Sequence, residues 1–272
     1  MCDNDNKCVP YYLCDPKNKV TTDGWLLIDE RFSVETPKKD LPICETLKTC
    51  CEKPKFISEI PTCDEFETPA KCGKRNPDGL GGNSKSLQGV SEFSNYAEFP
   101  WMMAVMNKTL HLLGGGSLIT PKIVLTAAHI IADTSIKDLI VRGGEYNTQT
   151  VEEMCKHEDM KVQNVIRHEN FLRRNLQNNL ALLVTHQPFK LTSFINTICL
   201  PPRHMKFVGQ RCLSSGWGKK FFNKNDLYQV YMKKVELPVV ASAKCQDQLR
   251  KTQLGEDFIL DEGFLCAGRK SN

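Results

Sequence analysis

The distribution of cysteine constrains this chain more than any other feature of its sequence. The 272 residues include 13 cysteines, and the first 51 positions hold six of them: Cys2, Cys8, Cys14, Cys44, Cys50 and Cys51. Cysteine at this density is typical of proteins that fold in an oxidising compartment, where disulfides persist. The sequence has neither a Cys-x-x-Cys pair nor a His-x₃₋₅-His pair. A zinc site of the clustered-cysteine type is therefore not expected, and we assign no metal.

The cysteines of this N-terminal head are expected to form disulfides. A head of about fifty residues buries too little apolar surface to be stable by its core alone. Cys50 and Cys51 are adjacent, and the side chains of neighbouring cysteines diverge, so each of them needs a distant partner. Spacing alone leaves the pairing open.

Composition separates the head, residues 1–52, from a linker and a body. Residues 53–90 are rich in Pro, Gly, Asn, Ser and Lys, which is typical of a linker. Residues 91–272 contain short apolar or alternating runs between turn residues, a pattern that predicts an all-β sandwich or barrel. The first six runs are Trp101–Val105, Gly116–Ile119, Ile123–Ala127, Leu139–Arg142, Lys161–Ile166 and Leu180–Thr185. One helix is predicted over Ser242–Thr252.

Charge and hydropathy argue against two classes of protein. The 36 Lys and Arg residues exceed the 32 Asp and Glu residues by only +4, and they are scattered along the chain. The basic face of a nucleic-acid-binding protein is therefore missing. No apolar run approaches the roughly eighteen residues that a membrane span needs. The first residues also lack the basic and apolar segments of a signal peptide, so we expect the natural N-terminus to lie outside this sequence.

Several motifs make the body resemble the chymotrypsin-like serine proteases. Residues 115–119 read Gly-Gly-Ser-Leu-Ile and residues 126–129 read Thr-Ala-Ala-His, while residues 178–183 (Asn-Asn-Leu-Ala-Leu-Leu) and 215–218 (Ser-Gly-Trp-Gly) follow in the family's order. The head, with Cys-Val-Pro-Tyr-Tyr-Leu-Cys at 8–14 and its terminal Cys-Cys, resembles a clip domain. Together they resemble the arthropod clip-domain serine proteases and their non-catalytic homologues.

This resemblance implies a double β-barrel behind the clip domain. The second barrel is expected to be incomplete, because only Arg211–Trp217, Tyr228–Leu237 and Gly263–Ala267 are available as its strands before the sequence stops at Asn272. Apolar side chains such as Met232 and Val235 are then expected to face water on one side.

The resemblance also assigns the catalytic positions. His129 stands at the position of the general base, and Asn179 stands where the family has the aspartate that orients it. An amide cannot stabilise an imidazolium ion, and the same Asp-to-Asn change in a related protease lowers turnover by about 10⁴. No Gly-x-Ser-x-Gly segment is present, so no nucleophile is assigned. The stretch 85–92 also lacks the Ile-Val-Gly-Gly-like junction at which an activatable zymogen is cut. We therefore expect a pseudoenzyme.

Disulfides of the body are likewise implied by the resemblance. Cys72 is expected to pair with Cys199 and Cys245 with Cys266, which leaves Cys63 and Cys155 as an extra pair. Cys212 would then remain a free thiol. Trypsin-like processing is expected at exposed basic residues, notably Arg31, Lys74 and Arg75.

Two further features are weaker. Glu145, Asn147 and Glu158 lie where some relatives bind calcium, although a solvated acidic loop is the preferred interpretation and no cofactor is assigned. Asn107 begins the glycosylation sequon Asn-Lys-Thr. The remaining histidines, 111, 157, 168, 186 and 204, are expected at the surface.

The resemblance implies a secreted, non-catalytic adapter or cofactor in an extracellular protease cascade such as arthropod innate immunity and melanisation. Its expected partners are other clip-domain proteases or cascade substrates such as prophenoloxidase. Two alternatives remain open. The chain could be part of an active trypsin-like endopeptidase, against which Asn179 argues, or the clip domain could be a binding module that the body merely presents.

Overall fold

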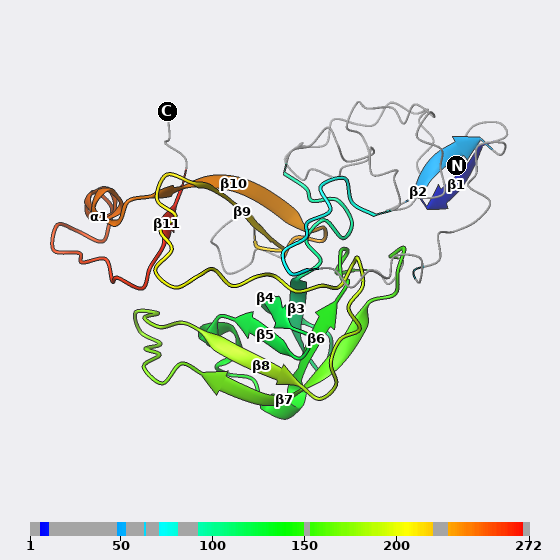
Figure 1. Ribbon diagram of the computed structural model, residues 1–272, viewed down its shortest axis with the longest axis horizontal. Helices are drawn as coiled ribbons and strands as arrows, with labels where there is room; N and C mark the ends of the chain where they lie inside the picture. Colours follow the sequence, from blue (N-terminus) through cyan, green and yellow to red (C-terminus); the bar gives the residue numbers. More distant parts are fainter. Residues whose placement is uncertain are drawn as a thin grey trace, which may run out of the picture.

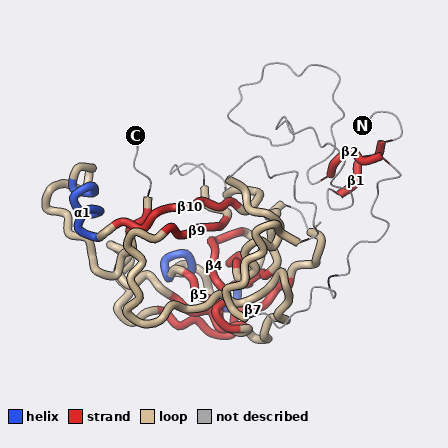
Figure 2. The backbone as a smooth tube through the Cα atoms, turned by 45° about the horizontal axis from the view of Figure 1, so that its top comes forward, coloured by secondary structure: helices blue, strands red, loops and turns tan. Residues whose placement is uncertain are grey.

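A computed structural model describes residues 6–10, 48–52, 63, 71–80, 92–149, 153–219 and 228–268. In these ranges the regular secondary structure is mainly β-strand (Figures 1 and 2). Helical structure is confined there to α1 (Ser242–Arg250) and to short 3-10 turns such as η5 (Ala128–Ile131) and η6 (Ile136–Asp138). The all-β fold predicted from the sequence is confirmed.

Six strands of the body close into a barrel in the order β3–β4–β5–β8–β7–β6, with every neighbouring pair antiparallel. They are β3 (Met102–Asn107), β4 (Leu112–Thr120), β5 (Ile123–Thr126), β6 (Leu139–Gly143), β7 (Glu158–Arg167) and β8 (Ala181–Thr185). Alternate residues of β8 are buried, as expected for a strand with one face toward a core. Closure leaves this barrel without an unpaired strand edge.

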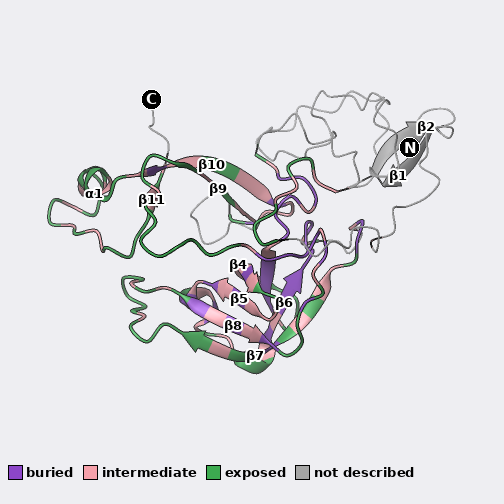
Figure 3. Cartoon of the chain, viewed as in Figure 1, coloured by how far each residue is buried: buried purple, intermediate pink, exposed green. Residues whose placement is uncertain are grey.

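The main hydrophobic core fills the barrel. Met103, Leu118, Val124 and Leu183 are fully buried there, and the buried segments in Figure 3 gather on the barrel strands. Gly116 explains part of the Gly-Gly-Ser motif, because a Cβ at this position would lie only 2.6 Å from Cγ1 of Val124. A larger residue would therefore push β4 away from β5.

A second sheet has the order β11–β10–β9 (Figure 1). Its strands are β9 (Arg211–Gly216), β10 (Lys233–Val240) and β11 (Cys266–Ala267), and α1 directly follows β10. Within the described residues, β9 and β11 are open edges of this sheet. None of the described helices has the length and apolar character needed to cross a bilayer.

Where the second sheet meets the barrel, the sequence-based expectation was partly wrong. Val235 is 45% exposed, but Met232 is 5% exposed and belongs to the main core. The backbone of Met232 donates to Tyr146 O and accepts from Ser94 N, at 3.2 and 3.0 Å. Trp217 Nε1 also donates to Tyr146 O, at 3.1 Å. The loop after β6 therefore lies against Met232, the residue just before β10, and helps to keep it from water.

Residues 71–80, which composition assigned to the linker, pack against the body. Gly73 N donates to Thr197 O at 2.7 Å, and Leu80 N donates to Tyr96 O at 3.1 Å. Asn76 Nδ2 donates to the carbonyl oxygens of Ala97 and Ser193. The Cys72–Cys199 bridge that was expected to tie this segment to the body is present, and the polar groups of the segment add hydrogen bonds to the body. The boundaries at 52 and 90 stay predictions.

In the head, the structure describes two antiparallel strands, β1 (Asn6–Pro10) and β2 (Lys48–Glu52). Their register places Cys8 opposite Cys50 and Lys7 opposite Cys51. Cys2, Cys14, Cys44 and Arg31 lie outside the described residues. The pairing of the head's cysteines therefore stays a prediction.

We expect the barrel to exchange its amide hydrogens much more slowly than the second sheet. Barrel strands are paired on both sides, whereas β9 and β11 each have an open edge in the described structure. Strands whose backbone is exposed to water at an open edge unfold locally at a lower free-energy cost than strands paired on both sides. Hydrogen exchange followed by mass spectrometry should give the slowest exchange in β4, β5 and β8. Equally slow exchange in β9 and β11 would contradict this expectation.

Candidate functional site

Strand pairing brings His129 and Asn179 together. His129 lies in η5, which begins two residues after β5, and Asn179 lies two residues before β8. Because β5 and β8 are neighbours, with Thr126 opposite Ala181, the two chain segments beyond those residues run past each other. Ala128 N donates to Asn179 O at 3.4 Å. The two residues that the motifs singled out are therefore in direct contact, although 50 positions separate them.

The amide of Asn179 makes two hydrogen bonds to His129. Asn179 Oδ1 accepts from the backbone N–H of His129 at 2.9 Å, and this contact fixes the amide orientation because only an oxygen can accept there. Asn179 Nδ2 then faces His129 Nδ1 at 2.8 Å. An amide nitrogen only donates, so Nδ1 must accept and the neutral imidazole carries its proton on Nε2.

This tautomer is unsuited to general-base catalysis. In the Ser-His-Asp arrangement, Nδ1 donates to the carboxylate and Nε2 is free to take the proton of the nucleophile. Here the amide holds Nδ1 as an acceptor. The Nε2 atom of the neutral ring carries a proton and has no lone pair for another.

We expect the tautomer of His129 to reverse in Asn179→Asp. The carboxylate would still accept from the backbone N–H of His129, but its second oxygen would now accept from Nδ1. Two-bond ¹H–¹⁵N spectra of the imidazole report the protonated nitrogen: we expect Nε2–H in the wild type and Nδ1–H in the variant. Asn179→Ala, which removes both contacts, is the reference. Nδ1–H in the wild type would show that the amide is turned the other way.

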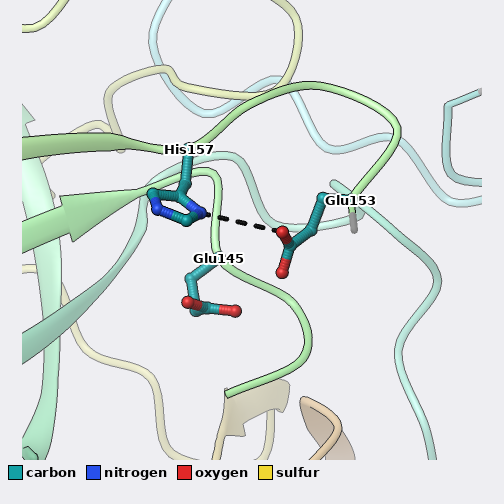
Figure 4. A group of neighbouring side chains, drawn as sticks. All are labelled: Glu145, Glu153 and His157. Carbon is teal, nitrogen blue, oxygen red and sulfur yellow. Dashed lines mark ion pairs between the residues drawn. The ribbon is translucent and has the colours of Figure 1, made fainter. Parts of the chain in front are cut away.

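A second group of functional side chains lies in the loop between β6 and β7. Glu145, Glu153 and His157 each place a ligand-type atom within 4.8 Å of the others (Figure 4). Glu153 Oε2 and His157 Nδ1 are 3.7 Å apart, and their side chains are 1% and 10% exposed. Burial raises the pKa of Glu145 to about 8, and the facing Glu153 carboxyl adds to this effect. Arg142 opposes it through Nη1, 3.1 Å from Glu145 Oε2.

This group differs from the calcium set that the resemblance implied. Glu145 belongs to it, but Glu158 begins β7 and its Oε2 accepts from Lys190 N at 3.4 Å. Asn147 is fully buried, and its Oδ1 accepts from Gln149 N at 3.0 Å. Ca²⁺ requires six to eight oxygen ligands, whereas the described set contains an imidazole. The three residues at which calcium was considered are therefore not the three that the fold assembles, and Glu145 and Asn147 are buried where a solvated acidic loop was preferred.

Sequence reasoning missed Glu153 and His157, and it expected His157 at the surface. The only sequence signal for a shared site was that the two residues are four positions apart, and this spacing predicts a site with Glu145 only if the segment folds back on it. Cys155 holds the segment in that folded-back position, because its side chain is bonded to Cys63 and its backbone N–H donates to the Tyr96 hydroxyl at 3.2 Å. The other histidines, 111, 168, 186 and 204, are exposed.

The body's cysteines occur as three disulfides in the described residues: Cys63–Cys155, Cys72–Cys199 and Cys245–Cys266. Cys212 is a free thiol in β9 and partly exposed. Asn107 ends β3, and its Oδ1 accepts from the Thr109 hydroxyl at 2.7 Å in an exposed turn. Lys74 is exposed, but Arg75 is not a free basic site, because its guanidinium pairs with buried Glu98.

The closed barrel, the neighbouring second sheet and the His129–Asn179 contact define a class of protein: a chymotrypsin-like fold in which an asparagine amide is hydrogen-bonded to the histidine after β5. Two family models match the chain, the trypsin model over residues 89–272 and the model described as "Serine protease Clip domain PPAF-2" over residues 1–52. The chain therefore belongs to the clip-domain serine protease homologues of the trypsin family.

Three of the similar proteins come from insects. "Phenoloxidase-activating factor 2" of Galleria mellonella is 42% identical over 74% of this chain and 70% of its own length. "Inactive CLIP domain-containing serine protease A28" of Anopheles gambiae is 34% identical over 96% of this chain and 72% of its own length. "Inactive CLIP domain-containing serine protease A8" of the same mosquito is 30% identical over 96% of this chain and 71% of its own length.

Proposed function

We propose that this protein is a secreted, catalytically silent protease homologue that acts as an adapter or cofactor in an extracellular protease cascade. It would bind proteins of that cascade, either clip-domain proteases or a substrate such as prophenoloxidase, and present them to each other without cutting either. The cysteine content and the clip-domain match support an extracellular location.

The observation that carries this proposal is the hydrogen bond between Asn179 Nδ2 and His129 Nδ1. A protease of this fold needs a carboxylate there to hold the imidazole as a base and to stabilise its charged form. The amide keeps the geometry of the pair but gives the neutral ring the wrong tautomer. A loss of about 10⁴ in turnover follows in a related protease from this change alone.

The names of the relatives support the same conclusion. The two mosquito proteins are called inactive, and they align with 96% of this chain. The moth protein is called an activating factor of phenoloxidase. Both descriptions agree with a cascade component that works by binding.

The alternative with a specific observation in its favour is an active trypsin-like endopeptidase, because His129 keeps its position after β5. The choice between the two can be made with His129→Ala. An adapter should support activation of phenoloxidase by a clip-domain protease equally well with and without this imidazole. An endopeptidase should lose its activity in the variant.

The experiment mixes prophenoloxidase and an active clip-domain protease with the wild type, His129→Ala or no addition, and measures phenoloxidase activity. Fluorophosphonate labelling of the wild type alone should give no labelled band. Stoichiometric labelling, or loss of support in His129→Ala, would refute the adapter proposal. A chain without residues 1–52 tests the remaining alternative: unchanged support from this chain would exclude the clip domain as the binding module.

A further inference from the structure

The Glu145–Glu153–His157 cluster contains buried polar atoms that make no hydrogen bond, although Glu153 Oε2 and His157 Nδ1 face each other as an ion pair at 3.7 Å. Among the described residues, Glu153 Oε2 and His157 Nδ1 are buried and lack hydrogen bonds. Their side chains point toward each other and toward Glu145 (Figure 4). Buried polar atoms nearly always have a partner, and an unsatisfied one often marks an ion. Two such atoms that face the same point indicate a ligand between them.

The donor set selects the kind of ligand. Two carboxylates and one imidazole nitrogen are the ligands of a zinc-type transition metal, which binds nitrogen at about 2.0–2.1 Å and oxygen at about 2.0–2.2 Å in a tetrahedron. Neighbouring ligand atoms in such a tetrahedron lie roughly 3.4 Å apart. The distance from Glu153 Oε2 to His157 Nδ1 is 3.7 Å, so only a small adjustment would bring both onto one ion. Three protein ligands leave a fourth position for water.

Charge points the same way. Arg142 is the cation next to the cluster, but it is shared: its Nε and Nη2 donate to Asp159 at 2.7 and 2.9 Å, while Nη1 donates to Glu145. Arg142 is therefore divided between Glu145 and Asp159, and none of the described ion pairs joins it to Glu153. Metal ligands bind in the deprotonated form, so a divalent cation would bind both facing carboxylates and release the proton that the Glu145 carboxyl otherwise holds.

The surroundings hold the ligands in place before any ion binds. Glu145 accepts from Arg142 Nη1 and, through Oε1, from Tyr146 N at 2.9 Å. Cys155 lies between Glu153 and His157 and is fixed by its disulfide to Cys63 and by the Tyr96 hydroxyl. Outer contacts of this kind orient metal ligands and raise affinity.

We propose that Glu145, Glu153 and His157 form a binding site for a zinc-type divalent transition metal, and that this ion is structural. The site adjoins the backbone of Tyr146 and Asn147, which contacts Met232 and Tyr231 just before β10. An ion there would stiffen the loop between β6 and β7 where it meets the chain that leads into the second sheet. This inference is independent of the proposed adapter function.

The test is metal titration of the full 272-residue chain after treatment with a chelator. Cys212→Ser serves as the background, so that the free thiol cannot bind metal. Calorimetry with Zn²⁺ should give one site per chain, and Ca²⁺ at the same concentrations should give none. His157→Gln and Glu153→Gln should each weaken Zn²⁺ binding at least about tenfold, which is the loss caused even by removing an outer contact. Zn²⁺ should also raise the thermal midpoint of the background chain.

Glu158→Gln and His168→Gln are matched controls, because they remove a carboxylate and an imidazole outside the cluster. Both should bind Zn²⁺ like the background chain. Co²⁺ offers a readout that does not depend on variant folding: four-coordinate Co²⁺ in the unmutated cluster should give intense visible absorption that Zn²⁺ abolishes. Absence of Zn²⁺ binding, equal binding in His157→Gln, or Ca²⁺ binding in place of Zn²⁺ would each overturn the proposal.

Discussion

Removal of the Cys72–Cys199 disulfide, by Cys72→Ser combined with Cys199→Ser, is expected to lower the free energy of unfolding by about 4 kcal/mol. The two cysteines are 127 positions apart, and a bridge that closes a long loop removes much conformational entropy from the unfolded chain. The Cys63–Cys155 bridge overlaps this loop and shortens the part that Cys72–Cys199 closes independently. The expected loss is therefore below that of an isolated loop of this length.

The residue after Cys72 is adapted to the disulfide with Cys199. The following residue, Gly73, has φ +76°, and a Cβ there would lie 3.2 Å from Cys199 Sγ. Only glycine adopts this backbone conformation without strain while it allows such a close approach. Glycine after Cys72 therefore allows the chain to turn directly beside the disulfide.

Urea denaturation of the oxidised protein measures the effect. Cys212→Ser is the control, because it makes the same chemical change at a cysteine that has no disulfide, and its midpoint should stay near that of the wild type. A double variant as stable as this control would mean that residues 71–80 are only loosely attached to the body.

Glu98→Ala is the second substitution with a large expected effect, a loss of about 3 kcal/mol. The Glu98 side chain is fully buried, and it accepts from Arg75, from Lys234 Nζ at 2.8 and 3.0 Å, and from Asn95 N at 2.7 Å. Alanine would leave two cations and a backbone donor without their acceptor. We expect the lower end of the range for broken buried ion pairs, because Arg75 and Lys234 are 33% and 21% exposed and can turn toward water.

Glu98 also connects three parts of the chain. Arg75 comes from the packed segment 71–80, Lys234 from β10, and Glu98 itself from the turn before β3. Glu236→Ala is the matched control, since Glu236 pairs with Arg211 across β9 and β10 with both side chains about half exposed. Exposed ion pairs contribute little, so the urea midpoint should hardly move. Equal losses in both variants would show that burial of Glu98 adds nothing to its ion pairs.

Both expectations concern residues outside the candidate functional site. Neither Glu98 nor Cys72 takes part in the His129–Asn179 contact. Within that contact, Asn179 Oδ1 accepts from the backbone N–H of His129, so the amide also helps to hold the segment after β5 in place.

Local sequence was sufficient wherever neighbouring residues alone determine the outcome. Alternating runs predicted the barrel strands, because one face of each strand is buried whatever its partner is. The predicted helix at Ser242–Thr252 corresponds to α1, which ends at Arg250. His129 and Asn179 were found because short motifs surround both residues.

Tertiary structure decided the features that depend on distant contacts. Arg75 was expected to be an exposed basic site, but a buried carboxylate 23 positions away holds it against the body. Met232 was expected to face water, and the loop at Tyr146 buries it. His157 was expected at the surface, and the Cys63–Cys155 bridge helps to place it among carboxylates. A sequence pattern records the preferences of neighbouring residues, whereas burial and charge pairing depend on which distant segments the fold brings together.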